Sequence, residues 1–141
     1  MSEVIIKRVE DIGDETGEFI NAEFTRYGKD NGVVLNFEEF CFVARDSEDK
    51  IAGVITGRAY YDEVHIDDLI VGQDYRRIGL GSRLVGAVED EFKGKNYNTV
   101  TLTTFGFQAP EFYKKLGYEL EFVRENKEPK LSKYFFKKYF S

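Results

Sequence analysis

The chain has 141 residues, of which 42% are hydrophobic and 16% aromatic, and its formal net charge is −6. This length and composition predict one globular domain, and the acidic balance argues against nucleic-acid binding, which usually leaves a basic footprint. The N-terminal residues contain no apolar run long enough for a signal peptide or a membrane span, and the single cysteine excludes an internal disulfide and a metal cluster. A cytoplasmic protein that binds neither membrane nor metal is therefore expected.

The first third of the chain predicts a strand followed by a helix. Residues 4–9 form a short apolar run, and Asp11 can cap the helix that follows. Hydrophobic residues then recur with helical spacing, whereas residues 33–38 fit either a second short helix or an ordered loop. The residues on the apolar face of this helix are Ile12, Phe19, Ile20 and Phe24.

The rest of the chain alternates strands with two helices. Apolar runs on either side of the polar turn 47–50 predict an antiparallel hairpin, and a later strand–helix–strand succession predicts a parallel pair with a right-handed crossover. Together these elements predict a mixed α/β sheet. The predicted strands are residues 40–45, 51–61, 64–71, 99–104, 118–124 and 133–140, and the predicted helices are residues 82–93 and 110–116.

A polar turn with two glycines leads from the strand 64–71 into the next helix. Gly79 and Gly81 let the backbone approach a bound group closely, and the helix start presents unpaired N–H groups that suit a phosphate. Arg76 and Arg77 add two permanent cations. A dinucleotide fingerprint is excluded because Leu84 occupies the place of its third glycine, and a Walker loop is excluded because the Gly-Lys-Ser/Thr ending is absent.

The spacing Arg76-x-x-Gly79-x-Gly81 resembles the pyrophosphate-binding motif Arg/Gln-x-x-Gly-x-Gly/Ala of the GCN5-related N-acetyltransferases. The ending Phe-Tyr-x-x-Leu-Gly-Tyr at residues 112–118 resembles the fourth helix of that family, and the segment from Phe107 looks like a subgroup of small bacterial acetyltransferases. The element order is similar over nearly the whole chain. The resemblance implies one N-acetyltransferase domain over residues 1–141, with the acyl-CoA N-acyltransferase fold: a central mixed sheet of about seven strands with helices on both faces.

This resemblance implies acetyl-CoA as the co-substrate. The strand before the glycine loop would carry a bulge, splay from the next strand, and offer backbone N–H groups to the pantetheine arm and the thioester carbonyl. Two departures concern Arg77, where the family often has glycine, and Gly106, where many members carry an asparagine that Gln108 is near enough to replace. The residues that the resemblance places against acetyl-CoA are Leu69, Ile70, Val71, Arg76, Arg77, Ile78, Gly79, Leu80, Gly81, Ser82, Gln108 and Phe112.

Amine acetylation needs a deprotonated acceptor, a polarised thioester carbonyl and a protonated leaving thiolate. Tyr113 matches the tyrosine that protonates the thiolate in the family, and the alternative for this residue is a core aromatic. Cys41 has no histidine nearby in the sequence, which favours direct transfer over an acyl-enzyme.

The proton acceptor is predicted on the strand that precedes the glycine loop. Asp67 is the favoured base, followed by His65 and Glu63, and a water chain without a dedicated base is a further alternative. Period two predicts that Asp68 faces the opposite side. The residues that the same period places on one face are His65, Asp67, Leu69 and Val71.

The predicted function is direct transfer of an acetyl group from acetyl-CoA to a primary amine. Because Asp62, Glu63, Asp67 and Asp68 cluster near the substrate side, and anionic walls attract cations, the acceptor is expected to be a cationic small molecule. The alternative is a non-catalytic acyl-CoA-binding or protein-interaction module on the same fold. A homodimer is expected through the aromatic strand 133–140, with burial of both of its faces inside the monomer as the alternative.

Overall fold

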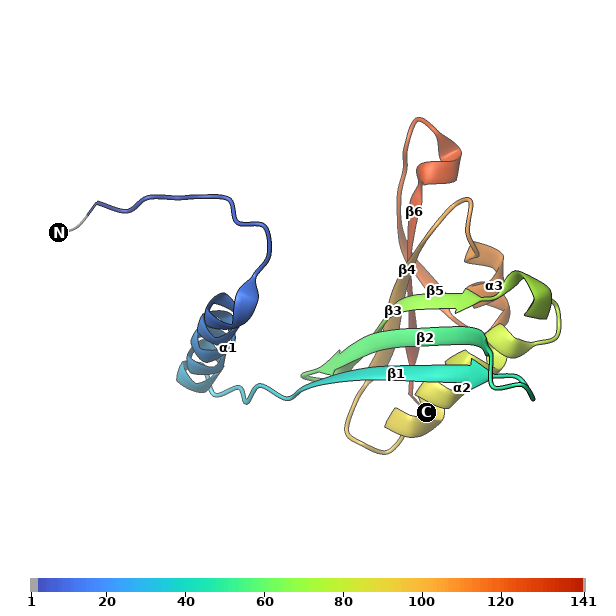
Figure 1. The fold of residues 1–141 in the computed structure, drawn as a ribbon, viewed down its shortest axis with the longest axis horizontal. Coiled ribbons are helices and arrows are strands. Elements are labelled where there is room, and N and C mark those ends of the chain that lie inside the picture. Colours follow the sequence, from blue (N-terminus) through green and yellow to red (C-terminus); the bar gives the residue numbers. More distant parts are fainter. Residues whose placement is uncertain (1–2, 141) are drawn as a thin grey trace. The chain divides into compact units, whose positions relative to one another are not determined.

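The computed structural model describes residues 3–140, which divide into two compact units, one up to Leu35 and one from Asn36 (Figure 1). The first unit contains α1 (Gly13–Asp30), whose N-cap is Ile12. Within the described residues Asp11 makes no capping hydrogen bond, so the predicted cap is wrong. Residues 33–36 form a loop rather than a second helix.

The predicted strand over residues 4–9 is also wrong. This segment forms no strand in the described chain, and its apolar side chains Val4, Ile5 and Ile6 are exposed. A strand needs a hydrogen-bonded partner, and β-propensity alone does not supply one.

The second unit is one mixed sheet in the order β1-β2-β3-β4-β6-β5, in which β3 and β4 are parallel and the other neighbours antiparallel. This confirms the predicted fold class with six strands, because residues 4–9 do not join the sheet. The strands are β1 (Phe37–Arg45), β2 (Ile51–Tyr60), β3 (Glu63–Val71), β4 (Thr99–Phe105), β5 (Glu119–Arg124) and β6 (Lys133–Tyr139).

Two α-helices, α2 (Leu80–Phe92) and α3 (Pro110–Lys115), cover one face of this sheet. Two short 3-10 turns, η1 (Gln73–Tyr75) and η2 (Pro129–Leu131), complete the unit. The predicted apolar stripe of α2 is buried, and each such side chain contributes about 1.5–3 kcal/mol by leaving water. Helices on both faces of the sheet stay a prediction. The core residues of the stripe are Leu80, Leu84, Val85, Val88 and Phe92.

Strand β6 lies between β4 and β5, so its backbone is paired on both sides. Phe136 is fully buried against the helices, whereas Tyr139 is exposed. A dimer could therefore use only the side-chain face of β6 and not its backbone edge, and the homodimer stays a prediction.

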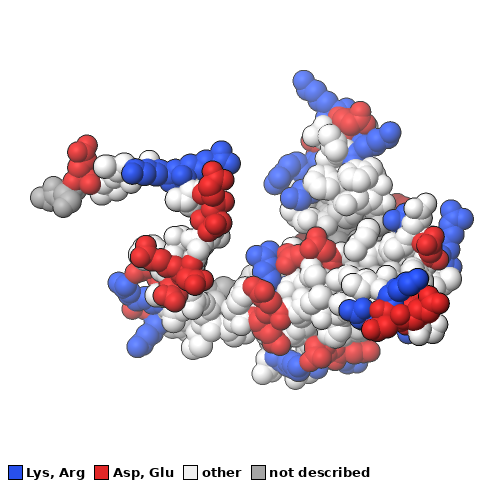
Figure 2. All heavy atoms as spheres, in the orientation of Figure 1, with Lys and Arg blue, Asp and Glu red and all other residues white. Residues whose placement is uncertain are grey.

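The charged surface mixes both signs. On the face shown in Figure 2, Lys and Arg side chains are interspersed with Asp and Glu over the second unit. No helix among residues 3–140 combines the length and apolar character needed to cross a bilayer.

A bulge in β3 positions the site. Thr56 pairs with Asp68 and Gly57 pairs with Ile66, so Asp67 is the extra residue without a partner on β2. A side chain at Gly57 would collide with the His65 carbonyl oxygen, which explains the glycine opposite the bulge.

The bulge reverses the alternation of side chains along β3. Leu69 and Val71 pack against the core, whereas His65 lies on the outer face of the sheet. The prediction that these residues share one face is wrong, because period two holds only while the register is unbroken. The parallel pairing of β3 with β4 also stops at Ile66 and Leu102, and the two strands separate beyond that point.

Candidate active site

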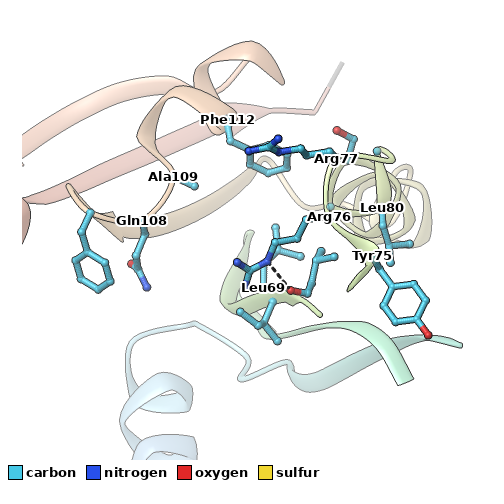
Figure 3. A pocket seen from close by; sticks show the side chains of 14 residues that line it. Leu69, Tyr75, Arg76, Arg77, Leu80, Gln108, Ala109 and Phe112 are labelled. Carbon is cyan, nitrogen blue, oxygen red and sulfur yellow. Dashed lines mark hydrogen bonds between the residues drawn. The ribbon is translucent and has the colours of Figure 1, made fainter. Parts of the chain in front are cut away.

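A cavity of about 810 Å³ opens beside the end of β3 (Figure 3). One wall is the strand end and the glycine loop, which contribute Arg76 and Arg77, and the opposite wall is the segment that carries Gln108, Ala109 and Phe112. Of the residues predicted to contact acetyl-CoA, all except the exposed Ile78 line this cavity.

The glycine loop leads directly into α2. Gly79 is the N-cap in the left-handed region, with φ +79°, and the Arg83 N–H makes a bond of 3.1 Å to its carbonyl oxygen. No side chain of the described chain caps this helix start, so its first amides remain available to an anion. A Cβ at Gly81 would lie 3.2 Å from the Phe112 ring, which shows that the backbone closely approaches the opposite wall.

Sequence reasoning missed Tyr75, which also lines the cavity. Its hydroxyl donates a hydrogen bond to Asp46 in the β1–β2 turn. That bond raises the pKa of Tyr75 and lowers the pKa of Asp46. Asp46 also accepts from the backbone N–H groups of Glu48 and Lys50, so a tight turn is tethered to the loop before α2. The contact joins residues 29 positions apart, and no local pattern reveals it.

A second cavity, of about 530 Å³, lies in the gap where β3 and β4 separate. It shares Leu69, Ile70, Gln108 and Ala109 with the first cavity, so the two form one groove. Tyr113 lines this gap, although only 7% of the residue is exposed. Burial raises the pKa of Tyr113 to about 12.

Two acidic side chains lie at the mouth of the gap, on the side away from the glycine loop. Both Asp67 and Asp68 line it, because the bulge turns consecutive residues toward the same opening. Arg58 donates to both oxygens of Asp67, at 3.1 and 3.0 Å. Asp68 accepts the Thr56 hydroxyl at 3.0 Å and has no ion pair within residues 3–140. The predicted opposite orientation of these two aspartates is therefore wrong.

The other two base candidates lie outside the gap. His65 and Glu63 line a neighbouring hollow of about 400 Å³ on the outer face of the sheet. Asp67 lies between the gap and this hollow, since its Oδ1 is 3.9 Å from His65 Nε2. The structure thus brings the three candidates into one row along β3, with only Asp67 in the gap itself.

Comparison with known proteins decides the family. The sequence profile of the Acetyltransferase (GNAT) family matches residues 9–118. The chain belongs to this family. Acetyl-CoA is the acetyl donor of the GNAT family, and a groove with free amides at a helix start, two arginines and a close backbone approach at Gly81 fits its pyrophosphate and pantetheine arm.

Individual relatives are acetyltransferases. An acetyltransferase structure from Bacillus cereus ATCC 14579 has 36% identity and a TM-score of 0.76, and the match covers 94% of this chain and 97% of that one. Blasticidin-S acetyltransferase from Streptomyces morookaense is 32% identical over 85 residues, 59% of this chain but only 62% of that relative. A Bacillus anthracis structure in complex with acetyl coenzyme A shares the fold at 22% identity and a TM-score of 0.64, over 72% of this chain and 62% of that one.

The GNAT departure at Gly106 has a steric cause. A Cβ at Gly106 would lie 2.5 Å from the Pro129 carbonyl oxygen, so the turn before η2 leaves no space for an asparagine. Gln108 Oε1 accepts the Phe105 N–H at 2.9 Å, which fixes its side chain to the end of β4, and its replacement of the asparagine stays a prediction. Because the amide oxygen is engaged, the Gln108 NH₂ group is the donor that faces the groove.

The second departure places an arginine where the backbone favours glycine. Arg77 has φ +68°, a left-handed conformation that costs a non-glycine residue about 1–2 kcal/mol. Arg76 is in extended backbone, and its Nε donates to the Val71 carbonyl oxygen at 3.2 Å. The strained residue is therefore Arg77, whose guanidinium lines the cavity.

We expect Arg77→Gly to change stability and ligand binding in opposite directions. Relief of strain should raise the free energy of unfolding by up to about 1 kcal/mol, after the larger entropy of the unfolded glycine chain is counted. Loss of one cation should weaken acetyl-CoA binding several-fold. Denaturant unfolding and calorimetry measure the two effects, and Arg77→Lys, which keeps both charge and strain, is the control. A variant that unfolds more easily than the wild type would contradict the strain argument.

Proposed function

We propose that this chain is an N-acetyltransferase that transfers the acetyl group of acetyl-CoA directly to a primary amine. The observation that carries the proposal is the continuous groove, which begins at the amides of α2, passes the end of β3 and ends in the gap at Tyr113. A phosphate site at one end and an acid at the other are what a long thioester co-substrate requires. Family membership supports the same conclusion.

The strand end supplies the proposed binding groups for the thioester. Beyond the bulge, β3 no longer pairs with β4, so the backbone N–H groups of Leu69 and Val71, which alternate toward that side, are available to the pantetheine arm and the carbonyl oxygen, whereas the backbone of Ile70 faces β2. N–H donors aimed at a developing oxyanion stabilise the transition state. Tyr113 is the proposed proton donor to the departing thiolate. Cys41 lies on β1 outside both cavities, in keeping with direct transfer.

We propose a cationic small-molecule acceptor that enters at the aspartate mouth of the gap. Asp67 forms an ion pair with Arg58, whereas Asp68 has no ion pair in the described chain and is the proposed carboxylate that attracts a cation. A relative named for acetylation of blasticidin-S supports a small-molecule acceptor. The proposed domain spans residues 1–141, and the family match extends across both compact units. A cytoplasmic location and a homodimer are further proposals.

The test is thiol release from acetyl-CoA with a panel of cationic, neutral and anionic amines at low salt. We expect cationic amines to turn over fastest, and Asp68→Asn to raise their KM about five-fold, as loss of about 1 kcal/mol of Coulomb attraction implies. Asp90→Asn on the exposed surface of α2 is the control. Melting that shifts with acetyl-CoA without thiol release for any amine would instead favour a non-catalytic acyl-CoA-binding module.

A further inference from the structure

The outer face of the sheet carries a row of hydrogen-bonded polar groups beside the gap. His65 Nδ1 lies 2.7 Å from the Thr101 hydroxyl oxygen, and the Thr101 hydroxyl donates to the Glu63 carboxylate. On the other side of the ring, Nε2 faces Asp67 across 3.9 Å, a distance too long for a hydrogen bond. Both oxygens of Asp67 already accept from Arg58.

The direction of these bonds fixes the tautomer of the imidazole. A hydroxyl has one hydrogen, and a carboxylate can only accept. Because Thr101 gives its hydrogen to Glu63, its oxygen must accept from His65, and Nδ1 must carry the proton. In the neutral ring Nε2 is then the nitrogen with the free electron pair, and it is the nitrogen that lies on the Asp67 side.

We propose that Thr101 and Glu63 are positioning residues that hold His65 in its Nδ1–H form, so that Nε2 takes the proton of the acceptor amine. This inference rests on the proposed acetyl transfer. The N–H bond of the acceptor ammonium breaks, and its electron pair stays on the amine nitrogen for attack on the thioester. Because His65 lies just outside the gap, the proton passes to one bridging water, which gives a proton to Nε2. Asp67, held by Arg58, then stands beside the imidazolium and stabilises its charge.

Burial and the surrounding charges keep His65 in the neutral form that can accept a proton. Burial lowers the pKa of His65 below its usual 6.5, and the nearby carboxylates of Asp67 and Glu63 oppose that change. The imidazole is therefore neutral at pH 7. Below its pKa the base is already protonated, so kcat/KM should fall on the acid side with a midpoint under 6.5. The other charged or titratable groups that face this ring or line its hollow are Arg58, Tyr60, Glu121, Lys133, Lys137 and Tyr139.

The first arm of the test reads the tautomer directly. His65 is the only histidine of the chain, so a long-range ¹H–¹⁵N spectrum of tag-free protein contains one imidazole. We expect a protonated Nδ1 and a bare Nε2. Thr101→Ser should keep this form, and Thr101→Val should give a mixture. Glu63→Gln should reverse it, because the new amide donates to Thr101 and frees the hydroxyl hydrogen for Nδ1.

The second arm reads the role in turnover. His65→Gln should lower kcat/KM by about 10²–10⁴-fold, the usual contribution of a positioned base. Thr101→Val should lower it by about ten-fold or more, toward the ~10⁴-fold cost of a wrong tautomer in a serine-protease triad, with KM for acetyl-CoA unchanged. Thr101→Ser should restore wild-type turnover within about two-fold.

Several outcomes would overturn the proposal: a wild-type spectrum dominated by Nε2–H, a Thr101→Ser variant as impaired as Thr101→Val, or a His65→Gln variant with unchanged kcat/KM. Absence of thiol release from the wild type with every amine would instead contradict the proposed function. The nitrogen shifts still decide the tautomer in that case, because they require no substrate.

Discussion

Tyr113→Phe should lower kcat at least about a hundred-fold while leaving acetyl-CoA binding nearly intact, since a positioned acid typically contributes 10²–10⁴-fold. The substitution removes one oxygen atom from a ring that packs against Phe112, Tyr118 and Phe136, so the ring itself stays buried. The hydroxyl makes no hydrogen bond to another group in the described part of the chain, and it borders the gap in which the thiolate would leave. Steady-state thiol release at saturating substrates measures the effect.

The pKa of Tyr113, about 12, determines how kcat should depend on pH. Because the phenol stays protonated up to pH 10, Tyr113 should produce no alkaline limb in kcat below that pH. A tyrosine at its unperturbed pKa near 10 would already be half ionised there.

Tyr118→Phe is the matched control for the loss of a buried hydroxyl. The Tyr118 hydroxyl donates to Glu89 at 2.9 Å, and Glu89 also pairs with Lys138 at 3.1 Å. Its removal should cost about 1–3 kcal/mol of stability, as expected for a hydrogen bond to a charged group, without a comparable loss of kcat. If Tyr113→Phe retains kcat within about two-fold of the wild type, Tyr113 is a core aromatic and not the acid.

Gly81→Glu should abolish acetyl-CoA binding, with at least about a hundred-fold rise in Kd. The new side chain would begin 3.2 Å from the Phe112 ring and would bring a carboxylate to the amides of the α2 start. Those amides and the helix dipole favour an anion, so the carboxylate competes with the pyrophosphate for the same donors and repels it. Calorimetric titration with acetyl-CoA measures the loss.

Gly86→Glu is the matched control, because it makes the same substitution in the same helix. A Cβ at Gly86 would have no atom within 4 Å, and Gly86 lines neither cavity of the groove. This variant should bind acetyl-CoA like the wild type and melt at the same temperature or higher, because glycine in a helix interior costs about 0.8–1 kcal/mol relative to better helix formers. A folded Gly81→Glu variant with unchanged affinity would place the pyrophosphate elsewhere.

The proposed phosphate end of the groove was predictable from the sequence because its chemistry is local. Two glycines before an amphipathic helix fix both the approach of the backbone and the exposed amides, within a few residues of each other. The same locality made α2 and the strands from β1 onward predictable, since each has its own periodicity and turn residues. The segment 4–9 shows the limit: its composition fits a strand, but no partner pairs with it in the described chain.

The acceptor end was decided by tertiary structure. One unpartnered residue, Asp67, breaks the period of β3, and this places Leu69 against the core while His65 faces the other side. The family resemblance implied a bulge in this strand, but no local pattern near residue 67 gives its position, because the position depends on Gly57 of the neighbouring strand. The tautomer of His65 likewise depends on Thr101, 36 residues away. The sequence by itself therefore determined the proposed phosphate site, whereas long-range strand pairing decided which side chains line the proposed amine site.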